Sequence, residues 1–527
     1  MQLVAYGAQD VYLTGDPQIT FWKVAYKRHT NFSMESVEQT FNGVADFGRK
    51  VTCTLQRNGD LAHRMYLQVT LPAVQCLSTT SGCFRWVNYV GHALIKSVEV
   101  SIGGQRIDKH YGDWLNIWNE LTQKPGLRAG YDNMVGNTIH LTGTGLSNTE
   151  ATTLYVPLQF WFCRNPGLAL PLIALQYHEV RVDVEFRNKN ECYVSTQSVG
   201  NCGLTVSGDS TFCVPSLDYA ALYVDYVYLD TDERRRFAQT THEYLIEQLQ
   251  FTGDETVTST NVKLKLNFNH PVKELVWVCQ KDDVITVSGS DGATVHRNQW
   301  SNYTDAADSD ISWVLSTDGD HELLHSNVEA GWAVNNFPAN TSSNAGPAQL
   351  FPTNAQLTGN LGLGGITGTS FGPANFGPGA QVSPTNFAAL TNAGNGADHG
   401  GLGPLNAGRN PVVYAKLQLN SQDRFSERLG SYFNLVQPYQ HHTNVPSTGI
   451  NVYSFALHPE DHQPSGSCNF SRIDNAVLQL QLTTRAVAST ITSGQGTGTA
   501  SCRVRVYAVS YNILRVMSGM AGVAYSS

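Results

Sequence analysis

The chain has 527 residues, a formal net charge of −9 and only 15% charged residues, where an average soluble protein has about 25%. Aromatic residues reach 10%, which excludes a generic disordered protein, because disorder goes with few aromatics and a high net charge. The acidic balance excludes a basic nucleic-acid coat, and the longest apolar run, Gly167 to Leu175, is far shorter than the about 20 residues of a membrane-spanning helix.

The N-terminus and the cysteines predict a reducing compartment. The sequence begins MQLVAYGAQD, without a basic segment followed by an apolar one, so we expect no secretory signal. None of the 10 cysteines forms a CxxC pair, and such scattered spacing predicts free thiols. Cys192, Cys202 and Cys213 are the one trio to be checked for a disulfide.

Most of the first half alternates between apolar and polar residues in short runs, the pattern of a β-sandwich or barrel. Val180 to Phe186 is the clearest case, with apolar residues on one face and charged residues on the other. Eight strands, the number in a jelly roll, are predicted near residues 36–42, 49–57, 64–71, 94–102, 154–162, 168–174, 177–187 and 217–229. The second half repeats the scheme from about residue 243 to 515.

Helices are predicted to be few and short. Between Tyr111 and Leu121, apolar residues that include Trp114 recur at helical spacing. Asp232 to Phe237 and Tyr244 to Leu249 are weaker candidates.

The two halves share three blocks in one order, which predicts two copies of one β domain. Gln105 to Asn116 aligns with Gln422 to Asn434 when one residue is inserted, with Gln, Arg, Gly and Asn matched in turn. Residues 154–184 align with 452–482, and residues 65–71 align more loosely with 275–279. The predicted organisation is an N-terminal segment at 1–28, a first domain at 29–232, a connector at 233–242 and a second domain at 243–527.

A long insertion at 280–413 breaks the symmetry of the second domain. From Gly331 to Asn410 its only charged residues are Asp398 and Arg409. Phenylalanines recur along it, whereas a linker repeats Gly and Ser, so we expect a loop that packs on itself or on a neighbour. Loops of this length in a compact domain are usually functional or disordered.

Residues 321–325 read HELLH, the H-E-x-x-H pattern in which two histidines bind zinc and the glutamate acts as a base. The flanking residues predict a loop rather than the required helix, and no third ligand follows at a recognised spacing. We therefore predict a solvated loop and no metal here, with zinc hydrolysis as the alternative.

Four histidines, His441, His442, His458 and His462, gather near Glu460, and we predict a surface cluster on loops rather than a metal site. No P-loop, dinucleotide fingerprint or nucleophile elbow occurs in the sequence. We therefore predict no catalytic residue, no cofactor and no metal.

Two of the four N-x-[ST] sequons, those at Asn302 and Asn340, lie in the insertion, where a glycan would have room. They are the candidate glycosylation sites. Without secretory routing, unmodified asparagine is the alternative.

Seven long blocks stand out across both ends and the middle of the chain. They are AQDVYLTGDPQITF at 8–21, YKRHTNF at 26–32, IGGQRIDKHY at 102–111, PGLALPLIALQYHE at 166–179, EYLIEQLQFTG at 243–253, QPSGSCNFSRIDN at 463–475 and YNILRVMSGM at 511–520. Together and in this order they resemble the major capsid proteins of nucleocytoplasmic large DNA viruses, in the branch of algal viruses and mimivirus relatives.

The resemblance implies an all-β chain of two tandem eight-stranded jelly rolls with long inter-strand loops and few short helices. It implies a homotrimer whose six jelly rolls form a pseudo-hexagonal capsomer of an icosahedral shell, in a virion assembled in the host cytoplasm. Residues 280–413 would form an outer tower. Residues 1–28 would lie at the inner base, near neighbouring capsomers, penton and minor capsid proteins and the internal viral membrane, with no direct contact to nucleic acid. A simple cap over the first jelly roll is the alternative for residues 1–28.

Two other classes of function stay open beside a structural protein. One is a zinc enzyme that uses His321, Glu322 and His325. The other is a glycan-binding module, because jelly rolls also form lectins and the insertion carries aromatic residues.

Overall fold

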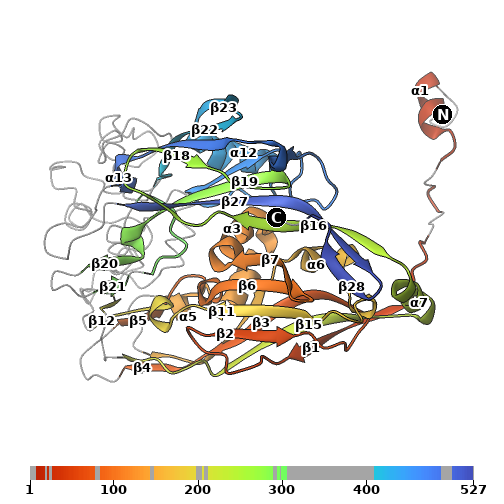
Figure 1. Ribbon diagram of the computed structural model, residues 1–527, viewed down its shortest axis with the longest axis horizontal. Helices are drawn as coiled ribbons and strands as arrows, with labels where there is room; N and C mark the ends of the chain where they lie inside the picture. The colour runs from red at the N-terminus through yellow and green to blue at the C-terminus, as the bar shows by residue number, and fades with distance from the viewer. Residues whose placement is uncertain are drawn as a thin grey trace, which may run out of the picture.

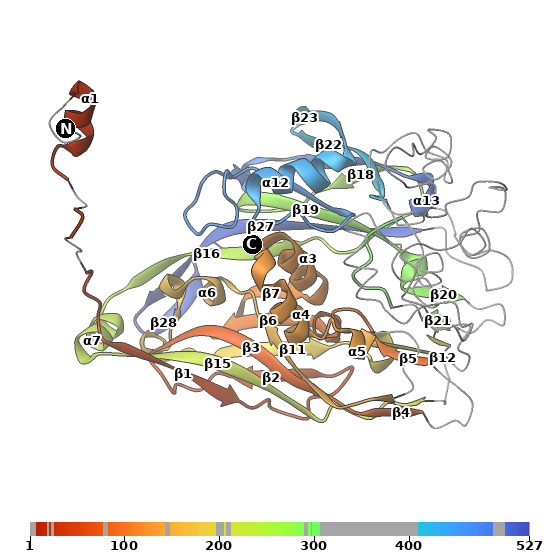
Figure 2. The ribbon, with the colours of Figure 1, turned by 180° about the vertical axis from the view of Figure 1, so that it is seen from behind.

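The computed structural model describes residues 7–17, 20–22, 26–76, 83–142, 148–196, 205–206, 212–288, 294–296, 298–305, 409–487 and 501–525. Most of them form antiparallel β-sheets, which are arranged as two similar halves packed side by side (Figure 1). The long axes of the main strands run in roughly the same direction in both halves (Figure 2).

The first half is a jelly roll of eight main strands in two sheets, with the two-residue β10 as an addition to one of them. In one sheet, β15 lies between β1 and β3, and β9 and the short β10 both pair with β3; in the other, the order is β2-β11-β6-β7. The strands are β1 (Phe32–Gln39), β2 (Lys50–Thr54), β3 (Leu61–Leu71), β6 (Ile95–Ile102), β7 (Gln105–Tyr111), β9 (Thr152–Pro157), β10 (Leu170–Pro171), β11 (Val180–Phe186) and β15 (Tyr219–Leu229).

The second half repeats this topology for all eight main strands. Its sheets have the orders β16-β27-β19-β24 and β18-β26-β22-β23, and β17, β25 and β28 pair with strands of the first of these sheets. The strands are β16 (His242–Phe251), β17 (Glu255–Val257), β18 (Asn261–Lys265), β19 (Pro271–Lys281), β22 (Val412–Leu419), β23 (Gln422–Leu429), β24 (Ile450–Ser454), β25 (Cys468–Asn469), β26 (Ala476–Leu482), β27 (Cys502–Met517) and β28 (Met520–Val523). The predicted fold class, a double jelly roll, is confirmed, and the aligned sequence blocks fall on equivalent strands.

Three details of the strand prediction were wrong. The strand expected at 168–174 is the two-residue β10, which pairs with β3 at Leu170 and Pro171 and is flanked by short 3-10 turns whose apolar residues fill the core. The eighth main strand is instead β7, which lacks the alternating apolar pattern of a strand because many of its residues are charged. Tyr244 to Leu249, a helix candidate, lies in β16, because its side chains pack between the two halves of the molecule.

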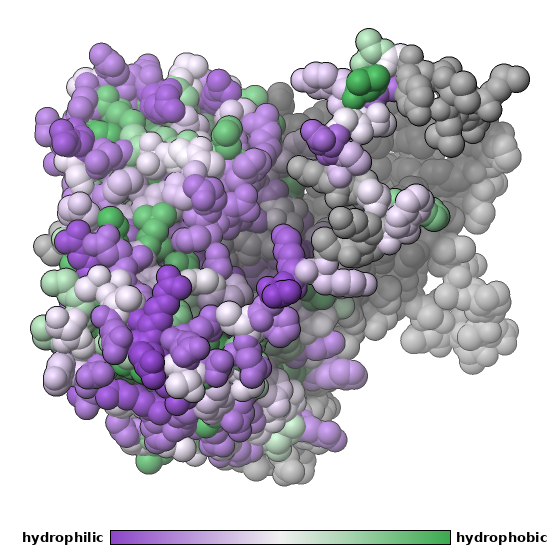
Figure 3. Space-filling view, turned by 90° about the vertical axis from the view of Figure 1, so that its right-hand side faces the viewer, coloured by the Kyte–Doolittle hydropathy of each residue, from purple (hydrophilic) through white to green (hydrophobic). Residues whose placement is uncertain are grey.

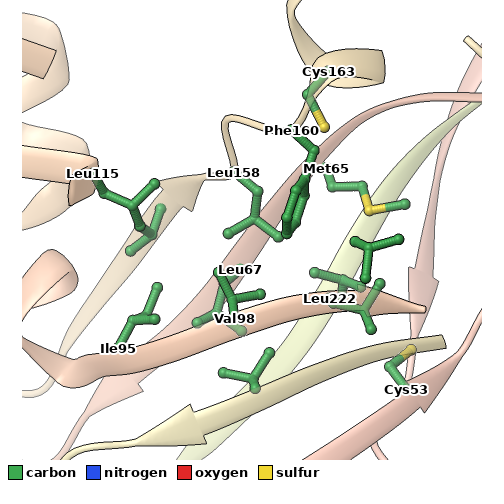
Figure 4. Packing of buried hydrophobic residues seen from close by; sticks show 14 of the residues in the cluster. Cys53, Met65, Leu67, Ile95, Val98, Leu115, Leu158, Phe160, Cys163 and Leu222 are labelled. Atoms are coloured by element: carbon green, nitrogen blue, oxygen red, sulfur yellow. The ribbon is translucent and has the colours of Figure 1, made fainter. Parts of the chain in front are cut away.

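The core of the first jelly roll lies between its two sheets. In β3, alternate side chains such as Met65 and Leu67 point inward, and they meet Val98 of the opposite sheet and Leu222 of β15 (Figure 4). The second jelly roll has its own core, which includes Trp277, Leu417 and Leu480. Each half therefore buries one face of each sheet against the other sheet of the same half.

Helices connect the strands and cover their ends. The helix expected at 111–121 is α3, and the helix expected at 232–237 lies in α7, which joins β15 to β16. The helices are α1 (Ala8–Thr14), α2 (Val90–Leu94), α3 (Gly112–Thr122), α4 (Arg128–Val135), α5 (Ile139–Thr142), α6 (Trp161–Arg164), α7 (Thr231–Gln239), α12 (Gln437–His441) and α13 (Thr484–Val487), and a π-helical turn at Tyr432–Val436 precedes α12. Among the described residues, none of the helices is long and apolar enough to cross a membrane.

The two ends of the molecule differ. One end carries the remaining short strands, which are β4 (Val74–Cys76), β5 (Cys83–Trp86), β8 (Asn148–Thr149), β12 (Tyr193–Thr196), β13 (Thr205–Val206), β14 (Phe212–Cys213), β20 (Thr286–Ser288) and β21 (Thr294–His296). The other end carries α7 and β28, and α1 extends away from the body on that side (Figure 1). Viewed from that end, the described surface is mostly hydrophilic (Figure 3).

Candidate assembly interface

The two jelly rolls meet along a seam in which α3 of the first lies against a sheet of the second (Figure 2). Trp114, Ile117, Trp118 and Leu121 of α3 are 1%, 0%, 4% and 0% exposed. They pack on the outer side of the sheet β16-β27-β19-β24, on residues that include Val276, Val278, Ile450, Val452, Tyr507 and Val509. This sheet is therefore buried on both faces, one against its own core and one against α3.

A glycine places α3 in the seam. Gly112 directly follows β7, and a Cβ atom at this position would clash with the backbone carbonyl oxygens of His92 and Ile95. Only glycine lets the first turn of α3 approach β6 this closely. Gly430, which the repeat aligns with Gly112, meets the carbonyl oxygen of Val412 at the start of β22 in the same way.

Aromatic rings form the centre of the seam. The rings of Trp114 and Tyr507 are 5.2 Å apart, and Phe251 stacks on Tyr507 at 4.8 Å. Trp118, one turn along the same face of α3, lies 5.7 Å from Trp114, and the guanidinium group of Arg164 lies 4.6 Å from its ring. Offset and tilted ring pairs of this kind add to the free energy gained by burying the rings.

A buried arginine crosses the seam. Arg505 of β27 is 4% exposed, and its guanidinium group contacts Asp113 of α3 at 3.0 Å and Asp254 at 2.9 Å. Burial disfavours the charge of Arg505, but Asp113 and Asp254 outweigh it and raise the pKa of this side chain. The pair Arg505–Asp113 joins the two jelly rolls by a charged hydrogen bond that water does not reach freely.

A second ionic cluster lies beside the seam. Glu247 of β16 accepts a hydrogen bond from Arg164 of the first jelly roll at 2.8 Å and pairs with Lys273 at 2.7 Å. The side chain of Lys273 is fully buried, and burial lowers its pKa. Buried charges are tolerated only when they are paired, so this cluster fixes the relative position of β16, β19 and α6.

His442 is not on the surface, so the prediction of a surface cluster was wrong for this residue. Its side chain is fully buried between two carboxylates, with Nε2 3.1 Å from Glu274 and Nδ1 2.9 Å from Glu460. Burial opposes the charge, but the ion pairs with Glu274 and Glu460 are stronger and raise the pKa of His442 to about 9. The imidazolium fastens the end of α12 to β19.

Two other predicted sites can be placed only in part. The side chain of Asn302 is half-buried, its amide nitrogen donates to Gln299 at 2.8 Å, and its amide oxygen accepts from the backbone of Thr304 at 3.0 Å. A glycan at Asn302 would require the amide to leave the hydrogen bond to Gln299. Asn340, the residues 321–325 and Cys202 lie outside the described residues, and both glycosylation sites stay predictions.

Within the described part of the chain, no three His, Cys, Asp or Glu side chains converge in the manner of a metal site. Cys192 is a buried free thiol, and burial raises its pKa to about 12. A polar groove of about 490 Å³ lies between β7 and β16. None of these features brings together a nucleophile, a base and an oxyanion donor, the arrangement that acyl-transfer chemistry would need.

Two family models together cover almost the whole chain. Residues 20–230 match the family described as the N-terminus of the major capsid protein, and residues 233–522 match the large eukaryotic DNA virus major capsid protein. The major capsid protein of Phaeocystis pouchetii virus is 51% identical over 100% of this chain and 99% of its own length. Capsid protein 1 of Acanthamoeba polyphaga mimivirus is 39% identical over 100% of this chain and 99% of its own length.

A solved structure gives the same result. A quasi-atomic structure of the PBCV-1 virus capsid contains a chain that is 33% identical, with a TM-score of 0.60 over 96% of this chain and 100% of that chain. The chain belongs to the major capsid proteins of large eukaryotic DNA viruses. The resemblance inferred from the seven sequence blocks is therefore confirmed.

For a major capsid protein, the seam is a structural site. The relatives that match are structural proteins of virus capsids. In a capsid protein, aromatic packing and paired buried charges along the seam hold two jelly rolls as one block, so that the block can be repeated without internal movement.

The sequence pattern predicts α3 but not the seam. Asp113, Glu247 and Arg505 are ordinary charged residues in the sequence, and their partners are far away along the chain. Only the apolar run at residues 275–279 signals the buried outer face, because a strand buried on both faces loses its polar alternation.

Proposed function

We propose that this major capsid protein forms homotrimers, and that the six jelly rolls of a trimer make a pseudo-hexagonal capsomer that tiles an icosahedral shell. One observation carries the proposal. The two jelly rolls have the same topology and meet through unlike surfaces, a helix on one and a sheet on the other. Contacts between unlike surfaces of equivalent units repeat into rings or open helices, and three chains provide the six units of a hexagonal ring.

The proposal extends to the partners and the location of the protein. Neighbouring capsomers, penton proteins and minor capsid proteins are the proposed contacts, and assembly takes place in the host cytoplasm. Residues 1–28 are proposed to lie at the inner base, near the internal viral membrane, because Phe21, Trp22 and Tyr26 are exposed large aromatic side chains that a partner would cover. The chain makes no direct contact with nucleic acid in this proposal, and it is not an enzyme.

The proposed domain limits follow the same logic. The first jelly roll occupies 29–232, the connector 233–242, and the second jelly roll 243–527 with the insertion 280–413 as an outer tower. Asn302 and Asn340 are the proposed glycan acceptors, which peptide mapping by mass spectrometry of protein from virions would test.

Light scattering of the purified protein, together with electron microscopy of particles, tests the main proposal. The expected results are a mass of three chains and pseudo-hexagonal capsomers. A stable monomer at micromolar concentration would contradict it. Zinc analysis of the same sample tests the alternative at His321, Glu322 and His325, and stoichiometric zinc that is lost in His325→Ala would contradict a purely structural role.

A further inference from the structure

Each jelly roll has a helix surface and a sheet surface, and the internal seam covers only one surface of each jelly roll. One helix surface and one sheet surface therefore stay uncovered. The first jelly roll uses its helix α3, and the second uses the outer side of its sheet β16-β27-β19-β24. The second jelly roll also has a helix in the equivalent place, formed by the π-helical turn and α12, and the first has an equivalent sheet, β1-β15-β3-β9. Neither of these takes part in the seam described above.

The unused helix carries an exposed apolar surface, which we call the helical knob and define as Leu435, Val436 and Tyr439. Their side chains are 48%, 39% and 80% exposed. Counting from the aligned glycines Gly112 and Gly430, these residues correspond to Ile117, Trp118 and Leu121, the α3 residues that the seam buries almost completely.

The backbone of the helical knob is also unusual. The helical turns run from Gly430 to His441, and the part at Tyr432–Val436 has π-helical hydrogen bonding. Such turns are rare and are often found at functional positions, because the extra residue re-aims the side chains of the turn. Here the residues that follow the aligned glycine still divide in the same way as in α3. Phe433 points into the core, as Leu115 does, while Leu435 and Val436 point to solvent.

The unused sheet carries the tyrosine face, which we define as Tyr66, Tyr155, Tyr219 and Tyr223 on its outer side. Tyr66 stacks on Tyr223 at 5.5 Å and lies 6.1 Å from Tyr155. The hydroxyl groups of Tyr219 and Tyr223 donate hydrogen bonds to Glu38 of β1, at 2.6 Å and 3.4 Å. Exposed tyrosines held in place by their neighbours are typical of protein interfaces, since they bury a large area at a low cost in conformational entropy.

We propose that the helical knob of one copy packs on the tyrosine face of a second copy of this chain, in the way that α3 packs on the second sheet within one chain. This inference rests on the trimer proposed above and names its contact surfaces. The occupant is a second copy because the chain already contains this helix-to-sheet contact once. The helical knob and the tyrosine face are the helix and the sheet that a second contact of the same kind would need. Repeating the contact three times between chains, in alternation with the internal seam, closes a ring of six jelly rolls.

The difference between the two sheets agrees with this assignment. The sheet face in the internal seam is lined mainly by valines and isoleucine around the single buried Tyr507, whereas the proposed face between chains is lined by four tyrosines, two of which donate hydrogen bonds to Glu38. A face that is never separated from its partner can be mostly apolar. A face that must stay soluble on the unassembled chain has to satisfy polar groups until it is covered.

Two charge-bearing variants and one control test the pairing. The knob variant is Leu435→Lys with Tyr439→Lys, and the face variant is Tyr155→Lys with Tyr219→Lys. The control is Met520→Lys in the hairpin of β28, where the native side chain is 49% exposed, as Leu435 is at 48%. All of these side chains are at least a third exposed in the single chain, so circular dichroism and melting temperature are expected to show folded protein for each variant.

Light scattering coupled to size exclusion at micromolar concentration gives the readout. We expect three chains for the native protein and the control, and one chain for the knob variant and for the face variant. An equimolar mixture of the two variants retains one intact knob and one intact face, so it is expected to form a species of two chains and no closed trimer. Lysines on both altered surfaces repel each other and prevent the second contact.

Failure of this inference and failure of the trimer proposal are distinguishable. A trimer that persists in the knob variant, or a mixture that stays monomeric, overturns the pairing while leaving the trimer in place. Loss of the trimer in the control as well would show a general effect of added charge and would also overturn the pairing. A native protein that is monomeric refutes the proposed trimer itself.

Discussion

Two buried histidines show how the same residue type acquires opposite roles from its surroundings. Burial lowers the pKa of His92 to about 4, whereas the carboxylates of Glu274 and Glu460 overcome burial and raise the pKa of His442 to about 9. His92 is therefore neutral in the folded protein near pH 7, and His442 carries a charge. These two side chains should respond to pH in opposite directions.

We predict that His442→Gln lowers stability at pH 7 and removes part of its decline at alkaline pH. The folded pKa of about 9 lies above an unfolded value near 6.5, so the stabilisation is full below pH 6.5 and is lost as the pH rises through 9. Removing one partner of a buried ion pair costs about 3–5 kcal/mol. Denaturant unfolding from pH 6 to pH 10 measures this as a difference between native and variant protein that shrinks toward pH 10.

The neighbouring His441 provides the control for this experiment. It is half-buried, and its Nδ1 lies 2.9 Å from the backbone oxygen of Leu457, with no carboxylate partner among the described residues. His441→Gln is expected to leave the pH profile of the native protein unchanged. A difference between His442→Gln and the native protein that stays constant up to pH 10 would argue against an ionic role of His442.

His92 gives a prediction at acidic pH. Its folded pKa of about 4 lies below the unfolded value, so the stability that depends on a neutral imidazole is full above pH 6.5 and is lost as the pH falls through 4. His92→Gln, which can keep a hydrogen bond to Tyr131, is expected to weaken this loss in melting temperature between pH 6.5 and 4. Tyr131→Phe leaves the histidine in place and should retain the steep acid profile of the native protein.

At the scale of elements, the glycine before each helix decides where the helix lies. We predict that Gly430→Ala lowers the free energy of unfolding by about 1–3 kcal/mol or more, because its Cβ would clash with the carbonyl oxygen of Val412 and push the helix away from β22. The shift would also misplace the helical knob, so light scattering should show fewer trimers at a given concentration. Gly130→Ala is the control, since a Cβ at Gly130 of α4 meets no atom within 4 Å.

How much of the fold the sequence predicts depends on how local the cause is. The spacing of apolar residues was sufficient for α3 and for strands with one buried face such as β11, because that spacing follows directly from one-sided burial. The same rule failed for β7, whose polar residues face the seam and the solvent, and for β16, which packs between two jelly rolls. In both cases a partner distant in the sequence decides the pattern.

At the scale of the whole molecule, the comparison of β3 with β19 shows what the duplicated chain has changed. Residues 65–71 of β3 read MYLQVTL, with polar residues on the outer face, while residues 275–279 of β19 read LVWVC. The two strands are equivalent in topology, so the loss of alternation in the second reports that its outer face is covered. The sequence therefore indicates that the outer face of β19 is covered, but this becomes visible only when the two copies are compared. The comparison does not identify α3 as the element that covers the face.

This asymmetry leads to a prediction for a divided chain. A cut after residue 240, just beyond α7, would separate the two jelly rolls while keeping every main strand with its own sheets. The fragment 241–527 alone would expose the valines and aromatic residues that now contact α3, and such a patch favours aggregation. We expect this fragment to be insoluble when expressed alone, and to copurify in a 1:1 complex when the fragment 1–240 is coexpressed.

The position of Trp118 makes this experiment specific to the seam. Trp118→Glu in the first fragment places a charge among buried aromatic rings, where it has no partner except Arg164, and should abolish copurification. Leu127→Glu is the matched control, because Leu127 follows α3 closely and is 62% exposed. Soluble fragments that do not associate would mean that the connector, rather than the packing of α3 on the second sheet, holds the two jelly rolls together.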